Sequence, residues 1–146
     1  MSAPSLRERA LGYLARREHS RLELERKLAP HAENPEELSN VLDVLEQRGL
    51  LSAQRMVEQV VHGRRSKFGS QRIVHELREK GIDENLIAEA LPGLKETELD
   101  AAREVWRKKF DVAPANAKEH NKQVRFLMSR GFASDVIHKV LRQDDE

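Results

Sequence analysis

The feature that most constrains how this chain folds is a helical pattern that occurs twice, fifty residues apart. The segment Leu77-Arg78-Glu79-Lys80-Gly81-Ile82 corresponds to Leu127-Met128-Ser129-Arg130-Gly131-Phe132, and Leu86-Ile87-x-x-Ala90-Leu91 corresponds to Val136-Ile137-x-x-Val140-Leu141. In both copies a glycine stands where the first helix is expected to stop in a left-handed conformation. Because the copies align without a gap, each residue keeps its place on the same helix face. The chain is therefore predicted to consist of copies of one module.

The composition favours several small cores over one large core. Of the 146 residues, 35% are charged, 38% are hydrophobic and only 4% are aromatic. Such a thin apolar supply suits modules stacked in a line, where each module buries part of its surface against its neighbour. No segment alternates in the manner of a β-strand, so no sheet is expected. We predict an all-α, elongated stack of three tandem three-helix modules, about nine helices in total, spanning 1–50, 51–93 and 94–146.

Capping residues indicate where the helices of the first module begin and end. Ser5 and Ser20 each open a capping box, in which a serine is followed three residues later by a glutamate. Asn34 is expected to cap a third helix, with Pro35 in its first position. Gly49 is expected to end that helix, which completes the first module.

Similar signals divide the middle of the chain. Ser52 is predicted to cap the fourth helix, and Ser70 and Asp83 are predicted to cap the two helices of the central repeat. Pro92 is expected to end the second helix of that pair, because proline lacks the amide hydrogen that a helix interior needs. A longer helix is then expected to begin near Thr97.

The chain is expected to close with two further helices and a tail. A helix over 117–130 is predicted to turn Leu127 and Met128 inward, and Ser134 is predicted to cap the last helix. Residues 143–146 are expected to form a short, acidic, frayed tail.

The net charge of +1 hides an alternation of charged blocks. Counting Lys and Arg against Asp and Glu, residues 1–28 carry +3, 29–54 carry −4, 55–82 carry +4, 83–104 carry −5 and 105–146 carry +3. A single block of this kind is typical of a solvated helical surface. Alternation along the chain also suits a long partner whose own surface varies in sign.

Several classes of functional site have no counterpart in this sequence. The absence of cysteine excludes a disulfide frame and a thiolate metal site, and fits a reducing cytoplasm. The six histidines lack the spacing of a metal site, the seven glycines form no phosphate-binding loop, and no nucleophile motif is present. No apolar run approaches a membrane span, and the N-terminus lacks a signal-peptide core. We expect a cytoplasmic, non-enzymatic protein that uses no cofactor, metal or membrane.

The remaining candidate site is a set of cations near the middle of the chain, all expected to be exposed. Its members are Arg64, Arg65, Lys67, Arg72, Arg78 and Lys80, with Arg125 and Arg130 as candidates in the third module. A solvated helix face is the ordinary explanation of such a set, and contact with phosphates or an acidic protein surface is the functional one. Asp83 and Glu84 open the following helix, which disfavours its use as a recognition helix in the major groove. Phe68 is the only aromatic residue in the basic run, so the run has few side chains that could stack on the bases of a single strand.

Taken together, several short motifs give the chain a resemblance to the RecX family, bacterial regulatory proteins of the RecA recombinase. The matching segments are Tyr13-Leu14-Ala15-Arg16-Arg17-Glu18-His19-Ser20-Arg21, Glu23-Leu24-x-x-Lys27-Leu28, Gly49-Leu50-Leu51, Lys67-Phe68-Gly69, Glu76-Leu77-Arg78-x-Lys80-Gly81-Ile82 and Arg125-Phe126-Leu127-x-x-Arg130-Gly131-Phe132. Each motif is weak, but their order and spacing are specific and run nearly from end to end. One departure is Ser52-Ala53, where the family usually carries acidic residues.

The resemblance implies a curved, elongated stack of three-helix modules. It also implies binding in the helical groove of the RecA nucleoprotein filament, with mostly inhibitory effects on recombinase, ATPase and coprotease activity. Weak contact with DNA is compatible with this activity. The thin apolar supply and the repeated modules separately predict that the protein is an elongated monomer. The alternative from a different class is a stand-alone nucleic-acid-binding helical protein. The near-neutral total charge disfavours that alternative, because strong DNA binders usually need a basic excess to displace counterions.

Overall fold

A computed structural model describes residues 3–142 of the chain. Its elements in chain order are α1 (Leu6–Arg16), α2 (Arg21–Leu28), the 3-10 helix η1 (Ala29–His31), α3 (Pro35–Gln47), α4 (Ala53–Arg64), α5 (Ser70–Glu79), α6 (Glu84–Lys109), α7 (Ala117–Ser129) and α8 (Ser134–Arg142). No strand occurs between residues 3 and 142, and the predicted all-α class is confirmed. The acidic tail expected over 143–146 lies outside the described residues.

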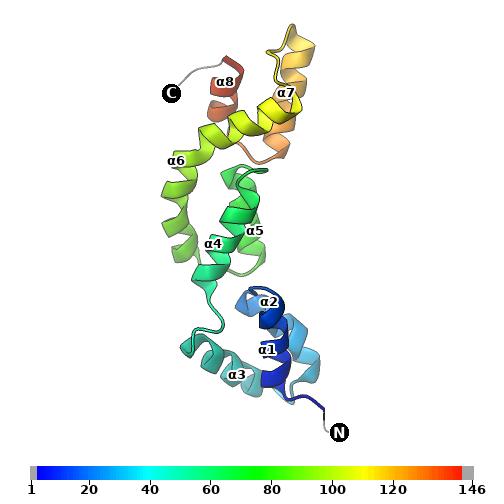
Figure 1. The fold of residues 1–146 in the computed structure, drawn as a ribbon, viewed down its shortest axis with the longest axis vertical. Coiled ribbons are helices and arrows are strands. Elements are labelled where there is room, and N and C mark those ends of the chain that lie inside the picture. The colour runs from blue at the N-terminus through cyan, green and yellow to red at the C-terminus, as the bar shows by residue number, and fades with distance from the viewer. Residues whose placement is uncertain (1–2, 143–146) are drawn as a thin grey trace.

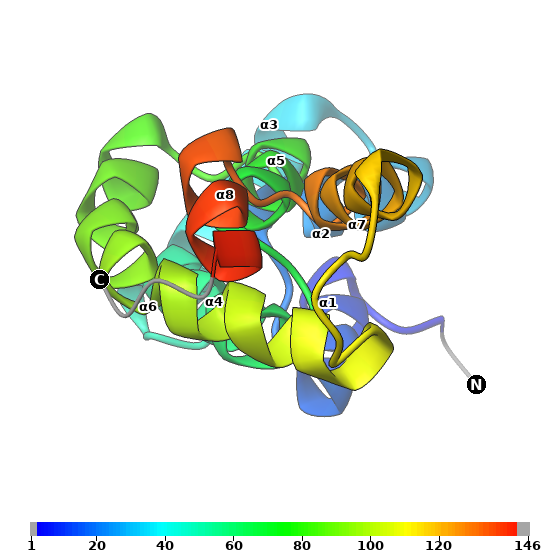
Figure 2. The same ribbon diagram turned by 90° about the horizontal axis from the view of Figure 1, so that it is seen from above.

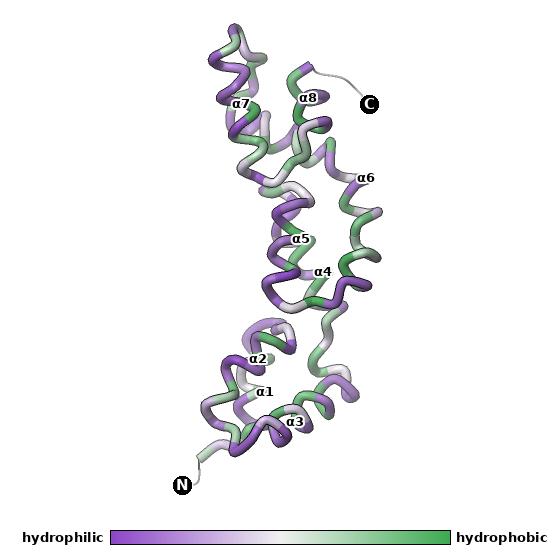
Figure 3. The backbone as a smooth tube through the Cα atoms, turned by 180° about the vertical axis from the view of Figure 1, so that it is seen from behind, coloured by the Kyte–Doolittle hydropathy of each residue, from purple (hydrophilic) through white to green (hydrophobic). Residues whose placement is uncertain are grey.

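The helices form three groups along one long axis (Figure 1). Helices α1, α2 and α3 make the first unit, and α4 and α5 with the first half of α6 make the second unit. The second half of α6 joins α7 and α8 in the third unit. Viewed along the long axis, the three units lie over one another, as expected for an elongated stack (Figure 2). Most helices carry both hydrophobic and hydrophilic stretches, the pattern of an amphipathic helix (Figure 3).

Each unit surrounds its own small core. The first core includes Leu6, Leu24, Leu28, Leu42, Leu45 and Leu51. The second includes Met56, Val60, Ile73, Leu77, Ile87 and Leu94, and the third includes Ala102, Val105, Leu127, Phe132, Ile137 and Val140. This division into small cores follows from the thin apolar supply. The exact boundaries predicted at 50/51 and 93/94 stay predictions, and the second of them falls inside α6.

The fifty-residue repeat is visible in atomic detail at the two matching turns. Leu77 and Leu127 are both fully buried, and the glycines that follow them, Gly81 and Gly131, have φ angles of 77° and 92°. The amide of Ile82 donates to the Leu77 carbonyl at 3.1 Å, and the amide of Phe132 donates to the Leu127 carbonyl at 3.2 Å. These are the six-residue hydrogen bonds of a Schellman motif, and the left-handed glycine makes them possible.

Helix α6 departs from the prediction, because it does not end at Pro92. It is 26 residues long and contains the proline in its interior. The expected end at Pro92 and the expected start near Thr97 are both wrong, and the number of α-helices among residues 3–142 is eight rather than about nine. Thr97 lies inside the helix, where its hydroxyl donates to the Gly93 carbonyl at 3.0 Å. Ile87 and Leu94, which lie on either side of Pro92, both belong to the second core, so burial on both sides of the proline opposes the break. The ribbon bends along α6 instead of stopping (Figure 1).

Most of the predicted helix caps are confirmed. Side-chain oxygen atoms of Ser5, Ser20, Asn34, Ser52 and Asp83 each accept a hydrogen bond from an amide in the first turn of the helix that follows. At Ser20 the reciprocal bond also forms, because the Glu23 side chain accepts from the Ser20 amide, and this completes the capping box.

Three local predictions in the second and third units are wrong. Ser70 is the first residue of α5, and Gly69 is the capping residue, without a side-chain bond. Ser134 likewise stands inside α8 as its first residue. Met128 is 56% exposed, because α7 turns Gln123 and Leu127 toward the core instead. The Gln123 amide is satisfied there: its oxygen accepts from the Trp106 indole at 2.9 Å, and its nitrogen donates to the Val112 carbonyl at 3.0 Å.

Candidate partner-binding surface

The basic segment after α4 is held against the third unit by backbone hydrogen bonds. The Gly69 amide donates to the Arg130 carbonyl at 2.7 Å, and the Gln71 amide donates to the Gly131 carbonyl at 3.2 Å. These bonds satisfy amides at the start of α5 that have no partner within the helix. A Cβ atom on Gly69 would lie only 2.3 Å from the Gly131 oxygen, so the two backbones approach this closely only because both residues are glycine.

An internal ion pair reinforces the same junction. Arg65 Nη2 lies 3.0 Å from Glu98 Oε2, and the two side chains are only 15% and 8% exposed. The Ser70 amide donates to Glu98 Oε1 at 3.0 Å, so a carboxylate of α6 does the capping that was predicted for the Ser70 hydroxyl. Arg65 was expected on the surface as a partner contact. It is instead a structural cation that joins the end of α4 to α6.

Two of the predicted cations, Arg72 and Arg130, come together around aromatic rings. The Arg72 guanidinium lies 4.1 Å from the centre of the Phe68 ring. The Arg130 guanidinium lies 5.6 Å from the same ring and 5.0 Å from the centre of the Phe126 ring, and Lys109 Nζ lies 5.5 Å from Phe126. We call Phe68, Arg72, Lys109, Phe126 and Arg130 the cation–aromatic cluster. Because cations already lie over both aromatic rings of the cluster, stacking of bases on these rings is disfavoured.

A shallow depression of about 340 Å³ adjoins the cation–aromatic cluster. Its lining residues are Ser66, Lys67, Val105, Lys108, Lys109, Phe126 and Arg130. Four of these seven residues are cations and none is acidic, which makes the depression a favourable place for an anionic group. Lys67 is exposed, and its side-chain ammonium group has no hydrogen-bond or ion-pair partner among the described residues.

Sequence reasoning missed Lys108 and Lys109. The signal was present as the run Arg107-Lys108-Lys109, but these residues lie about forty positions from Lys67 in the chain. Only the path of α6, which was expected to be broken at Pro92, brings its last turn to the loop between α4 and α5.

The other predicted cations lie elsewhere and pair with local groups. Arg64 pairs with Glu76 at 2.8 Å, Arg78 pairs with Glu84 at 2.9 Å, and Lys80 pairs with Glu23 of the first unit at 3.5 Å. Arg125 is exposed, and its Nε donates to the Asn121 carbonyl at 3.4 Å. Of the eight candidates, Lys67, Arg72 and Arg130 therefore share one surface, and the remaining five do not join it.

Glu23 sits where the first unit meets the second. Burial would raise the pKa of its carboxyl group, but hydrogen bonds from the Arg17 side chain and the Ser20 amide, with the charge of Lys80, lower this pKa to about 2. The carboxylate therefore stays ionised across the physiological pH range, and the contact with Lys80 remains a charged one.

His19 is the buried histidine of the first unit. Its Nδ1 lies 3.0 Å from the Arg17 carbonyl, and its Nε2 lies 2.9 Å from Lys27 Nζ. An ammonium group only donates, so Nε2 must accept and Nδ1 must carry the proton. Burial lowers the pKa of His19, which agrees with a neutral ring in a structural role.

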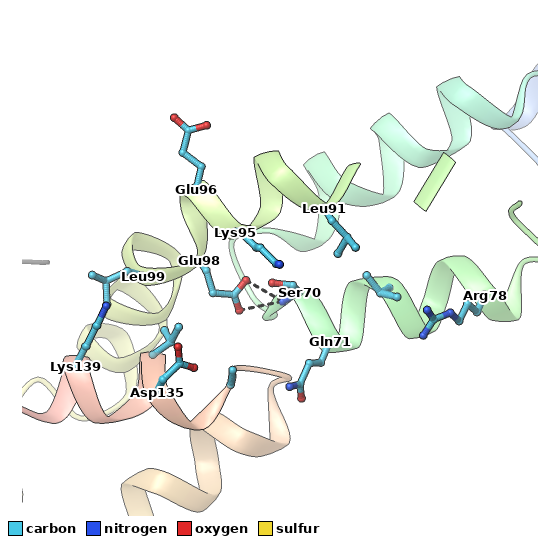
Figure 4. Close-up of a pocket in the computed structure, with 13 residues that line it drawn as sticks. Ser70, Gln71, Arg78, Leu91, Lys95, Glu96, Glu98, Leu99, Asp135 and Lys139 are labelled. Atoms are coloured by element: carbon cyan, nitrogen blue, oxygen red, sulfur yellow. Dashed lines mark hydrogen bonds between the residues drawn. The ribbon is translucent and has the colours of Figure 1, made fainter. Parts of the chain in front are cut away.

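A second and larger concavity of about 850 Å³ lies between α5, α6 and α8. Its apolar lining includes Val74, Leu91, Leu99 and Val136. Figure 4 shows Glu98 and Lys95 reaching from α6 toward the start of α5, whereas Glu96 points away. The two dashed bonds from Ser70 end on Glu98, so this carboxylate already has its partners (Figure 4).

The described part of the chain has neither a metal-binding cluster nor a membrane-spanning helix. Within residues 3–142, no three His, Asp or Glu side chains gather in a way that would hold a metal ion. None of the helices described there combines the length and the apolar character that a membrane crossing requires.

Each of the three units matches a domain of a known protein family. Residues 7–45 match the first three-helix domain of RecX, residues 54–91 match the second, and residues 96–141 match the third. Each match lies within one of the three units, and the last two divide α6 between them.

Individual relatives match over nearly the whole chain. The regulatory protein RecX of Leptothrix cholodnii is 55% identical over 141 residues, which cover 97% of this chain and 90% of the relative. That of Ralstonia pickettii is 44% identical over 142 residues, covering 97% and 89%. A crystal structure of RecX from Lactobacillus salivarius shares the fold with a TM-score of 0.80 at 21% identity, covering 96% of this chain and 94% of that one. The chain therefore belongs to the RecX family, whose members are regulatory proteins rather than enzymes.

Proposed function

We propose that this protein binds the RecA–DNA filament and mostly inhibits RecA, restraining strand exchange, ATP hydrolysis and coprotease action. Membership of the RecX family is the observation that carries the proposal. A partner of this kind also places the protein's action in the cytoplasm. The elongated stack gives the proposal a physical basis, because a filament repeats the same surface at regular intervals. Three units in a line contact successive protomers, and several weak contacts then add through effective concentration.

The surface around Lys67 is the contact site that we propose. Together with Arg72, Arg130 and the two lysines that end α6, it gathers cations from the loop after α4, α5, α6 and the end of α7. Such a surface suits acidic groups of the filament, either carboxylates of the protein or phosphates of the DNA. Arg64, Arg78, Lys80 and Arg125 remain secondary candidates, because each already has a partner within the protein.

The alternative function is a stand-alone nucleic-acid-binding protein. The acid-free depression beside Lys67 favours it, and the total charge of +1 disfavours it. Affinity for single-stranded DNA alone, measured beside affinity for the same DNA coated with RecA, separates the two functions. We expect the protein to bind the coated DNA at least about tenfold more tightly than the bare DNA, a difference of about 1.4 kcal/mol in the free energy of binding. Equal affinity, or tighter binding to bare DNA, would favour the alternative.

Charge reversal tests the proposed contact site. The double change Lys67→Glu and Lys109→Glu is expected to weaken binding to the coated DNA by at least about tenfold, because like charges across an interface repel. The loss is expected to shrink as salt rises, since part of the attraction is screened. The free energy of unfolding is expected to change by less than about 0.5 kcal/mol, because Lys67 and Lys109 are exposed and form no ion pair among the described residues.

The matched control is the double change Lys118→Glu and Lys122→Glu on α7. Both lysines are exposed and lie outside the depression, and the change in net charge is identical. We expect this control to retain most of the binding. If the two double variants lost binding equally, the effect would come from net charge alone, and the surface around Lys67 would not be the contact site.

A further inference from the structure

The three units are joined to one another in two very different ways. The second and third units share α6, and buried groups lock them together: the Arg65–Glu98 pair, the bonds from Ser70 to Glu98, and the close backbone contact between Gly69 and Gly131. A shared helix and a buried, charge-paired junction leave little freedom between these two units. Helices α4 to α8 therefore act as one body.

The first unit is attached far more lightly. All of the main helix-packing pairs lie either among α1, α2, η1 and α3 or among α4 to α8. Across the junction, Glu18 pairs with Arg55 at 2.7 Å and Glu23 pairs with Lys80 at 3.5 Å. Leu22 lies so near Gly81 that a Cβ atom on the glycine would be 2.9 Å from Leu22 Cδ2. A single connection of the chain joins α3 to α4 (Figure 3).

That connection passes from the first unit to the second between two adjacent residues. Leu51 is 3% exposed and belongs to the first core, so the chain is fixed to the first unit up to this residue. Ser52 is fixed to the second unit, because its hydroxyl caps α4 by accepting from the Arg55 amide at 3.2 Å. Only the backbone between Leu51 and Ser52 separates the two anchored residues.

The contacts across the junction are too weak to fix an orientation by themselves. Ion pairs between partly exposed side chains contribute about 0–1 kcal/mol each. Units within one chain move relative to each other by default unless a large apolar interface joins them. Neither the second nor the third core includes a residue of the first unit.

We propose that the first unit turns as a rigid body about residues 51–52, relative to the single body formed by α4 to α8. Arg55 and Lys80 are the latches that hold the orientation seen here. Arg55 is the stronger latch, because its Nη2 also donates to the Gly49 carbonyl at 2.7 Å. The motion allows the first unit to adjust to a long partner, but it is a property of the free protein and does not depend on the proposed function.

Distances between spin labels test the motion directly. The chain contains no cysteine, so pairs of labels are introduced cleanly at exposed helix positions. Asn40→Cys with Glu58→Cys spans the hinge, and Glu58→Cys with Lys122→Cys spans the second and third units. Double electron–electron resonance is expected to give a distribution at least about twofold wider for the first pair than for the second.

The latches are tested in the same labelled proteins. Arg55→Met with Lys80→Met is expected to widen or shift the first distribution and to leave the second unchanged. Arg64→Met with Arg78→Met is the matched control, because it removes two exposed ion pairs that lie entirely within the second unit. We expect no change in either distribution from that control.

A salt titration of the labelled protein that keeps both latches excludes misfolding of the latch variants as the cause of a wider distribution. Raising the salt concentration to about 1 M shortens the screening length to about 3 Å and weakens both latches in the otherwise unchanged labelled protein. The first distribution is expected to widen and the second to stay as it is. Two distributions of equal width, with the first unaffected by salt and by the latch variants, would overturn the hinge. That result would leave the proposed binding to RecA-coated DNA untouched, so the two proposals fail separately.

Discussion

Replacing Glu98 with alanine is expected to destabilise the protein by about 3–5 kcal/mol, the cost of leaving a buried charge without its partner. The Glu98 side chain is 8% exposed and accepts from Arg65 at 3.0 Å and from the Ser70 amide at 3.0 Å. Nε and Nη1 of Arg65 are buried and have no hydrogen-bond partner among the described residues. Glu98→Ala therefore removes the one counter-charge that the described part of the chain gives this guanidinium, and it also uncaps α5. Denaturant unfolding followed by circular dichroism measures the loss.

Two further variants make this test specific. Glu96→Ala removes the same charge from an exposed position on the same helix, and we expect a change of less than about 0.5 kcal/mol. Adding Arg65→Met to Glu98→Ala is expected to restore part of the stability, because the uncompensated charge is then gone. A loss below about 1 kcal/mol for Glu98→Ala would show that solvent reaches the pair and that the junction is held by other contacts.

Leu77→Ala and Leu127→Ala are expected to destabilise the protein by similar amounts, about 2–5 kcal/mol each. Both leucines are fully buried and stand at equivalent places in the fifty-residue repeat, each one accepting the hydrogen bond that closes its helix. Truncation therefore removes the same apolar group from two cores of similar construction. Thermal and denaturant unfolding of the two variants, compared with the unmodified protein, checks both the size and the similarity of the losses.

Met128→Ala is the control for this pair. Met128 directly follows Leu127 but is 56% exposed, so its truncation is expected to cost less than about 0.5 kcal/mol. The second and third cores share no residue, and the losses of the two leucine variants are expected to add in the double variant within about 0.5 kcal/mol. A neutral result at either leucine would contradict the equivalence of the two turns.

The candidate site could be predicted from the sequence only in part. The basic run from Arg64 to Lys80 was visible in the sequence, because charge is a property of each residue alone. Which of those cations share a surface was not visible, because exposure depends on what packs beside them. Arg65 became internal only through Glu98, a residue 33 positions away. Lys109 joined the cluster only through the course of α6.

The sequence by itself determined the features that depend on near neighbours. The caps at Ser20, Asn34 and Asp83 and the left-handed stops at Gly81 and Gly131 involve contacts within a few residues, so the pattern of side chains decides them. The repeat gave the all-α class and the three-unit stack for the same reason, since each unit is built mainly from local packing. The motifs that give the RecX resemblance are also read residue by residue, and family comparison agrees with them.

Only the tertiary structure decided the features that depend on competition between distant groups. Pro92 should end a helix on local grounds, yet Ile87 and Leu94 on either side of it are both buried in the second core, and this burial keeps α6 continuous. Ser70 should cap α5, yet the Glu98 side chain reaches that position from another helix and accepts the hydrogen bond of the Ser70 amide. In both cases a local preference of a few kcal/mol or less is outweighed by burial and charge pairing between segments far apart in the chain. That balance is set when the units pack, so the residues nearby in sequence contain no sign of it.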